Sequence, residues 1–171
     1  MPDQVKTLVT PGMRERQGIW SRDQVSPPIS LSDIRKWAIA VYWPHTPPRL
    51  FWDEEYAKTT RWGGIIAPQD FNPFAWPIKS ETFSPQSAPV PESSPLSGHP
   101  PKGRQGMNGG QSDTYFIAMR PGDVIRARHR LRDWNEAKTR LGLTLFFYSE
   151  TEWHNQNDQM VKRHIQTFIW Y

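Results

Sequence analysis

The last third of the chain alternates polar and apolar residues, and this period of two constrains the fold more than any other feature. In "VIRARHRLRDW", residues 124–134, Ile125 and Leu131 fall on one face of an extended chain. The opposite face carries Arg126, Arg128, Arg130 and Arg132. Residues 113–119, 141–153 and 160–171 are further strand candidates, separated by the turns "RPGD" and "HNQNDQ". The pattern predicts consecutive antiparallel strands.

Helix signals come earlier in the chain. In "SLSDIRKWAIAVYW", residues 30–43, Ser30 or Ser32 can cap a helix that Pro44 ends. "DEEYAKTTRW", residues 53–62, begins a second, short helix with Asp53 as its cap. Helices followed by antiparallel strands predict the α+β class, with the sheet packed against at least one helix.

The length of 171 residues fits one domain, 1–171. Residues 1–29 are polar and broken by prolines, so we expect a loose segment with one short strand near Val25. Residues 79–112 are rich in Pro, Gly and Ser and predict a long internal loop, closed by "GMNGGQ".

Composition excludes several functional classes. The chain has no cysteine, which excludes disulfides and thiolate metal sites, and its five histidines show no metal-ligand spacing. A net charge of +4 is weak support for nucleic-acid binding and suits a smaller anionic ligand. No apolar run is long enough for a membrane span, and the first residues lack the apolar core of a signal peptide. We expect a cytoplasmic protein with neither membrane nor nucleic-acid contact.

Several fragments, in this order, resemble the MaoC-like dehydratases. They are "DIRKWAIAV", "LFWDEEYAKTTRWGGIIAP", "GMNGGQSDTYF", "RPGDVI" and "ETEWHNQNDQMVKRHIQTFIWY", and together they span roughly residues 30–171. The chain looks most like the N-terminal, fatty-acid-synthase-type dehydratase branch. The resemblance implies a hot-dog fold, in which an antiparallel sheet wraps around a central helix. It also implies hydration or dehydration of acyl thioesters carried on coenzyme A or acyl carrier protein, with no further cofactor.

The catalytic residues of the related hydratases are absent here. Those enzymes carry G-D-x-N-P-x-H, and a carboxylate and a histidine are the residue types that activate water and protonate the α carbon. Aligning the end of the motif on Asp53, Trp62 and Gly63 places Thr46 in the aspartate position and Phe51 in the histidine position. Neither side chain can take up those proton transfers.

The resemblance therefore implies a degenerate hot-dog half that needs a second hot-dog subunit bearing Asp and His. Two alternatives stay open. One is a stand-alone hydro-lyase or thioesterase with a relocated catalytic group, and a homodimer in place of a hetero-oligomer is open as well. For that group the candidates are His45, which also reads as a surface loop residue, and Asp53, whose ordinary role is capping. The other is a non-enzymatic subunit that binds acyl-CoA.

Substrate contacts are expected at two places. In "GMNGGQ", the glycines allow close approach of a thioester and Asn108 can donate and accept, although the segment also reads as a turn entering a strand. Trp62 is a candidate for the wall of an acyl tunnel, though aromatic residues are commonly core. The resemblance also points to the start of the central helix. The predicted substrate-binding residues are Asn108, Gly109, Gly110, Trp62, Ala67 and Gln69.

The arginine row leaves three interpretations. Because guanidinium forks match phosphate oxygens, Arg126, Arg128 and Arg130 are candidates for binding the phosphates of coenzyme A. The same row is compatible with an acidic partner or with a solvated outer face of the sheet.

Overall fold

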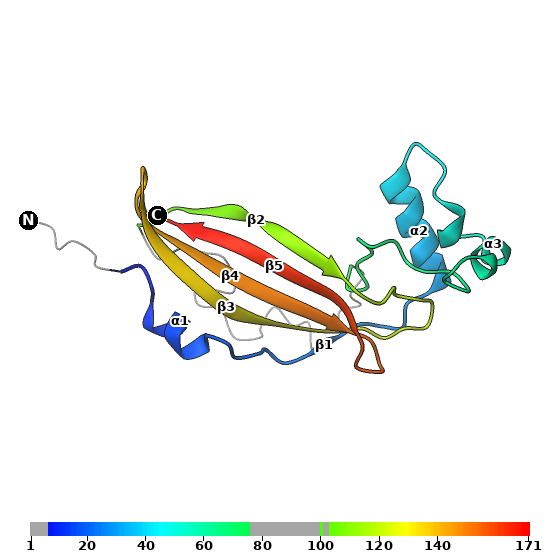
Figure 1. The fold of residues 1–171 in the computed structure, drawn as a ribbon, viewed down its shortest axis with the longest axis horizontal. Coiled ribbons are helices and arrows are strands. Elements are labelled where there is room, and N and C mark those ends of the chain that lie inside the picture. The colour runs from blue at the N-terminus through cyan, green and yellow to red at the C-terminus, as the bar shows by residue number, and fades with distance from the viewer. Residues whose placement is uncertain (1–6, 76–99, 101–102) are drawn as a thin grey trace, which may run out of the picture.

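The computed structural model describes residues 7–75, 100 and 103–171, which form one antiparallel sheet with two helices beyond one end (Figure 1). The strands are β1 (Gln24–Val25), β2 (Gly106–Tyr115), β3 (Arg126–Thr139), β4 (Gly142–His154) and β5 (Met160–Trp170). The helices are α1 (Pro11–Arg16), α2 (Leu31–Tyr42) and α3 (Glu54–Thr59), with a 3-10 turn η1 (Arg49–Phe51). The strand order is β1-β3-β4-β5-β2, and all neighbours are antiparallel. This confirms the α+β class.

The three long strands β3, β4 and β5 are the predicted meander. A two-residue turn joins β3 to β4, and Gly142 at its end has the positive φ of 94° that glycine adopts without strain. Between β4 and β5, Asn155 Oδ1 accepts hydrogen bonds from the backbone N–H groups of Asn157 and Gln159. The side chain of Asn155 therefore stabilises the predicted turn over 154–159.

The arginine alternation is confirmed for three of its four members. Arg126, Arg128 and Arg130 pair in register with His154, Glu152 and Glu150 on β4. The register then shifts between Leu131 and Asp133, so Arg132 does not continue the row. A bulge of this kind places one residue outside the ladder and breaks the period of two.

Both predicted helices form. Ser30 caps α2 by accepting a hydrogen bond from the Asp33 N–H, and Asp53 caps α3 in the same way from Tyr56. Ile34 and Ala38 of α2 are buried, and their spacing of four places them on one face of the helix. The outer end of the helix extends beyond the sheet, which leaves Val41 exposed.

Three expectations are corrected by the structure. The segment 1–29 is not loose throughout, because α1 packs Met13 against the sheet; residues 1–6 lie outside the described part. The loop prediction for 79–112 is wrong over 106–112, which belong to β2, while 79–99 and 101–102 lie outside the described residues. The start of the central helix, which the resemblance places near Ala67 and Gln69, is not observed over 68–75, where the chain makes turns.

Glycines misled the loop prediction because they have another role in β2. A Cβ on Gly109 would lie 2.8 Å from Cγ2 of Thr167, and Gly110 has a φ of 105° at a register shift. Glycine inside a strand marks a bulge or a close approach between strands. Composition alone cannot distinguish that use from a loop.

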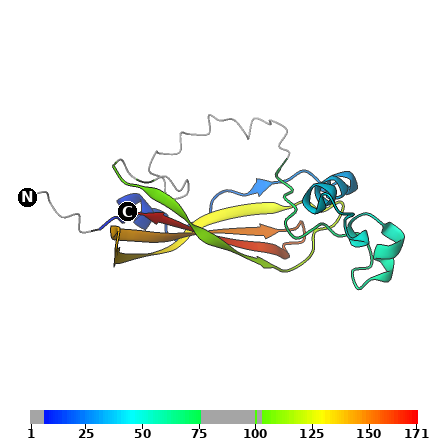
Figure 2. The same ribbon diagram turned by 90° about the horizontal axis from the view of Figure 1, so that it is seen from above.

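The core has two apolar clusters. The first joins α2, η1 and α3 to one end of the sheet and contains Ile34, Phe51, Ala57, Ile66, Met119 and Ile125. The second, at the other end, packs Leu8, Val9 and Met13 against Leu131, Leu145, Phe147 and Trp170. Figure 2 shows α2 and α3 beyond one end of the sheet. Among the described residues, no helix has both the length and the apolar character needed to cross a membrane.

Candidate functional site

The segment 44–57 contains Thr46 and Phe51, the two positions that the resemblance aligns with catalytic residues of the related hydratases. Thr46 and His45 are exposed to solvent. Phe51 is buried in the first core cluster, where its ring centroid lies 5.9 Å from that of Tyr42. The structure therefore places an inert apolar side chain and an exposed hydroxyl at these positions, with no proton-transferring group in either.

Asp53 is fully engaged in local structure. Its Oδ1 accepts a 3.0 Å hydrogen bond from the Tyr56 N–H, and its Oδ2 accepts two bonds from the Arg49 guanidinium at 2.9 and 2.7 Å. The backbone bond from Tyr56, and then Arg49, hold the pKa of Asp53 below its usual range. Capping is confirmed as its role in the structure, and a catalytic role stays an untested prediction.

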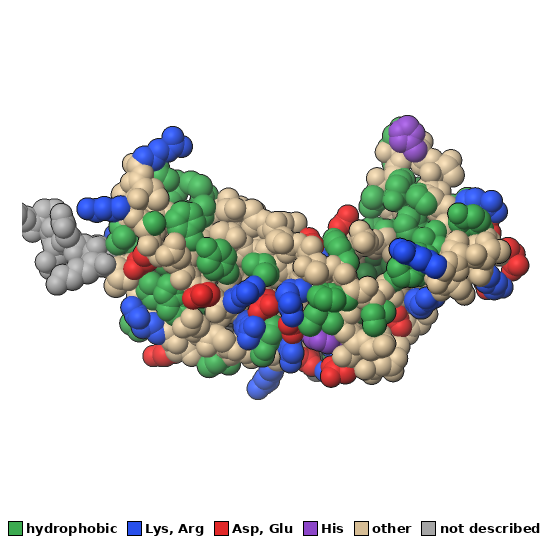
Figure 3. Space-filling model, viewed as in Figure 1, with side chains coloured by type: hydrophobic (Ala, Val, Ile, Leu, Met, Phe, Trp, Pro, Cys, Tyr) green, Lys and Arg blue, Asp and Glu red, His purple; other side chains and the backbone are tan. Residues whose placement is uncertain are grey.

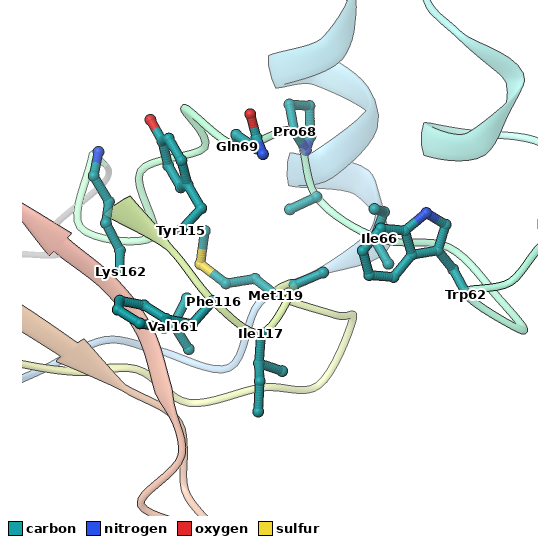
Figure 4. Close-up of a pocket in the computed structure, with 12 residues that line it drawn as sticks. Trp62, Ile66, Pro68, Gln69, Tyr115, Phe116, Ile117, Met119, Val161 and Lys162 are labelled. Atoms are coloured by element: carbon teal, nitrogen blue, oxygen red, sulfur yellow. The ribbon is translucent and has the colours of Figure 1, made fainter. Parts of the chain in front are cut away.

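A pocket lies between the segment 62–69, the end of β2 and the start of β5 (Figure 4). Its cavity volume is about 80 Å³, and it is partly open to solvent. Its lining is mostly apolar and includes Ile66, Ile117, Met119 and Val161. Trp62 lies at one end, and Tyr115 and Lys162 lie at the other. Mostly apolar walls with a few polar groups at one end are typical of a ligand site.

Three of the six predicted substrate-binding residues, Trp62, Ala67 and Gln69, line this pocket. The Ala67 N–H already donates a 2.8 Å hydrogen bond to Met119 O, and Pro68 has no N–H. These two neighbouring residues therefore offer no backbone donor to a thioester oxygen, which is the role such groups have in an oxyanion hole.

The other three, Asn108, Gly109 and Gly110, lie at the opposite end of β2 and do not line the pocket. Asn108 Oδ1 accepts from the Gly110 N–H at 2.8 Å and from Gln166 Nε2 at 2.6 Å. In the structure these residues shape the bulge of β2. Their contact with substrate stays a prediction.

A polar cluster at the rim of the pocket escaped the sequence analysis. Tyr115 donates a 2.8 Å hydrogen bond to Asp70, while Lys162 and His164 approach the same carboxylate oxygen of Asp113 at 3.2 and 2.8 Å. Burial and the bond to Asp70 raise the pKa of the Tyr115 phenol, so it stays protonated. Burial alone would raise the pKa of Asp113, but His164 and Lys162 outweigh it and hold that pKa below its ordinary value. The signal that could have found the cluster is the pairing of β2 with β5.

The comparisons with known proteins agree with this architecture. A family model described as "FAS1-like, dehydratase domain region" matches residues 16–164. The chain belongs to this family. No curated protein matches the chain.

Three solved structures similar to this FAS1-like dehydratase-region chain come from bacteria. The ChsH1-ChsH2 complex from Mycobacterium tuberculosis gives a TM-score of 0.62 at 17% identity, covering 88% of this chain and 87% of that chain. The MaoC-like dehydratase from Rhodospirillum rubrum gives 0.54 at 16% identity, covering 86% and 89%. The C-terminally truncated HadBC (3R-hydroxyacyl-ACP dehydratase) complex from Mycobacterium tuberculosis gives 0.52 at 18% identity, covering 86% and 96%. The fold is thus the α+β hot dog of the MaoC-like dehydratases, as the resemblance implied.

The arginine row of this FAS1-like chain pairs with acids of its own sheet. Arg128 Nη2 lies 3.0 Å from Glu152, Arg130 Nη2 lies 2.7 Å from Glu150, and Arg163 of β5 reaches both carboxylates at 3.2 Å. Figure 3 shows basic and acidic side chains interleaved over the middle of the sheet.

Two further contacts complete the pairing. Arg126 pairs with Asp23 and Asp158, and the Trp20 ring lies under the guanidinium groups of Arg128 and Arg130. An intramolecular ion-pair network was not among the three interpretations. Phosphate binding by Arg126, Arg128 and Arg130 stays a prediction that would have to compete with these pairs.

Proposed function

We propose that this chain is the non-catalytic half of an acyl-thioester hydratase or dehydratase and that a second hot-dog subunit supplies the catalytic Asp and His. The observation that carries the proposal is that the segment 44–57 has no proton-transferring side chain at position 46 or 51. Phe51 is built into the core, and Thr46 is an exposed hydroxyl. A base and an acid are both required to move water across the 2,3 bond, so the chemistry has to come from elsewhere.

The acyl pocket supports the same proposal. Its apolar walls suit a hydrocarbon chain, while Lys162 at one end can donate hydrogen bonds to the polar part of a ligand. We propose an acyl thioester on coenzyme A or acyl carrier protein as the ligand, with no further cofactor.

The free edge of the sheet supports a protein partner. β2 has one neighbour, β5, so its other edge is unpaired among the described strands. The exposed apolar side chains of Met107, Phe116 and Ile117 lie along and just after this strand. An unpaired edge with apolar side chains favours pairing with another chain. Two of the similar structures are themselves complexes of two named components, ChsH1-ChsH2 and HadBC.

The test is an assay of the hydration of crotonyl-CoA and longer enoyl-CoAs. The loss of the enoyl absorbance measures the rate. We expect no turnover by the purified chain, and turnover when it is co-expressed with a hot-dog subunit that carries G-D-x-N-P-x-H. Full hydration by the chain alone would overturn the proposal. Binding of acyl-CoA without turnover, even with such a partner, would favour a non-enzymatic binding subunit instead.

A further inference from the structure

The face of the sheet on which α1 packs, here called the inner face, is apolar at both ends and polar in the middle. Along β4, Leu145 and Phe147 belong to the second core cluster and Trp153 packs against the first. Ser149 and Thr151 lie between them on the same face, because successive side chains of a strand alternate. The register extends the Thr151 row across four strands: His129, Thr151, His164 and Asp113.

Asp113 and His164 form a closely bonded pair within this row. Asp113 Oδ1 lies 2.8 Å from His164 Nδ1, and both side chains are largely buried, at 17% and 26% exposed. When Nδ1 donates its proton to the carboxylate, the lone pair of Nε2 is available to accept a proton from water. A carboxylate that fixes a histidine in this way is the arrangement that makes imidazole a general base.

Lys162 connects the pair to the pocket. It lines the pocket and lies 3.2 Å from the same Asp113 oxygen. It precedes His164 by two residues on β5, so the two side chains point to one face about 7 Å apart along the strand. Tyr115, opposite Lys162 in register, completes this end of the pocket. An acyl chain held by the apolar walls would present its thioester toward the ammonium group of Lys162, which lies two residues from His164 on the same face of β5.

We propose that Asp113 and His164 are a hydrolytic pair that cleaves acyl thioesters held in this pocket, an activity separate from hydration. The inference rests on the part of the proposed function that gives the pocket an acyl thioester. His164 Nε2 takes a proton from water, the hydroxide adds to the thioester carbonyl, and Lys162 stabilises the oxyanion. The tetrahedral intermediate then breaks its C–S bond, and the imidazolium returns the proton to the leaving sulfur. The products are a carboxylic acid and a free thiol.

The single oriented base favours hydrolysis over hydration. In hydrolysis one imidazole removes a proton and returns the same proton to the leaving group. Hydration would require a proton to be delivered to carbon at a second position. Asp113 is already bonded to His164 and Lys162, and Asp70 is bonded to Tyr115, so neither carboxylate is free for that role.

The test uses the full chain alone with saturated substrates, butyryl-CoA and octanoyl-CoA, because a saturated acyl group cannot be hydrated. Release of the coenzyme A thiol is followed with a chromogenic disulfide, to which the protein contributes no background since it has no cysteine. We expect steady thiol release by the wild-type chain. His164→Gln lowers kcat about 100-fold, the size typical of a lost general base.

Positioning by Asp113 has its own readout. Asp113→Asn lowers kcat about 10-fold with little change in KM, as loss of a group that orients a histidine does, and Asp113→Glu recovers part of the rate. Free imidazole restores turnover to His164→Gly, which a purely structural histidine would not show. The matched control is His129→Gln, in the same row but with Thr151 opposite it in place of a carboxylate, and it keeps the wild-type rate.

The outcomes separate the two proposals. If acyl-CoA binds, measured by calorimetry, but no thiol is released, the hydrolytic pair is refuted and the proposed function stands. Equal rates for wild type and His164→Gln, with both variants folded by circular dichroism, also refute the pair. If no acyl-CoA binds at all, both proposals fail.

Discussion

Phe51 is a core residue in a segment, 44–57, whose other side chains are mostly exposed. Its ring packs against Tyr42 and within the cluster that joins α2 and α3 to the sheet. A histidine here would need a partner for its ring nitrogens inside an apolar environment. Neighbouring Asp53 also has a structural role, because its carboxylate caps α3 and pairs with Arg49.

Truncating this ring tests the structural role of Phe51. We expect Phe51→Ala to lower the free energy of unfolding by about 3 kcal/mol, because it leaves a cavity in the first cluster. Thr46→Ala, at the exposed position of the same loop, should change it by less than about 0.5 kcal/mol. Urea denaturation of both variants measures the difference. Similar values for the two variants would mean that Phe51 does not support the core.

At the scale of elements, the β3–β4–β5 meander is held by an ion-pair network as well as by its ladder. Glu150 and Glu152 on β4 are buried between arginines of β3 and β5. Burial alone would raise the pKa of Glu152, but the hydrogen bonds from Arg128 and Arg163 outweigh it and lower that pKa. Removing one member of a buried ion pair leaves the other charge buried without a partner, which destabilises the folded state.

This network makes the unfolding free energy depend on pH. Because the folded pKa of Glu152 is lowered from 4.5, its contribution is complete well above pH 4.5 and is lost as the pH falls through the folded value. We expect Glu152→Gln to cost about 1–3 kcal/mol at pH 7 and much less near pH 3. Denaturant titrations at both pH values measure how the difference in unfolding free energy between the wild type and Glu152→Gln decreases. Glu55→Gln, with 87% of its side chain exposed, is the control and should show no such trend.

At the scale of the whole molecule, the two edges of the sheet differ in how far other parts of the chain cover them. The β3 edge is covered by residues 17–26, whose backbone bonds to β3 and Ile125 through Gly18, Ser21 and Ser26. The β2 edge has no such cover in the described part of the chain. Among the described strands, β2 is therefore the long strand with an unpaired edge.

Introducing a charge at that edge tests the partner interface. We expect Met107→Lys to weaken the complex with the second hot-dog subunit, because an edge lysine opposes pairing between sheets. Ile19→Lys places the same charge at an exposed apolar residue beyond the opposite edge and should leave the complex intact. Co-purification and light scattering measure both. If Ile19→Lys dissociated the complex and Met107→Lys did not, the interface would lie elsewhere.

The sequence alone determined the features that depend on neighbouring residues. The helix caps at Ser30 and Asp53, the turn at 154–159 and the alternation of β3 up to Leu131 all arise from contacts within a few positions of each other. The prediction that Thr46 and Phe51 stand where the related hydratases have Asp and His likewise rests on the order of residues in one motif. The strand β2 could not be predicted from its glycine-rich sequence, because glycine is found both in loops and at strand bulges.

Only the tertiary structure decided which distant side chains meet. Asp113 and His164 are 51 positions apart, and Tyr115 and Asp70 are 45 apart, so their contacts depend on the register of β2 against β5 and on the path of residues 62–70. The ion pairs of the arginine row likewise depend on which strand carries the acids. A local pattern gives the face on which a side chain lies, but register is set by packing over the whole sheet, and that packing assembled the pocket and its polar rim.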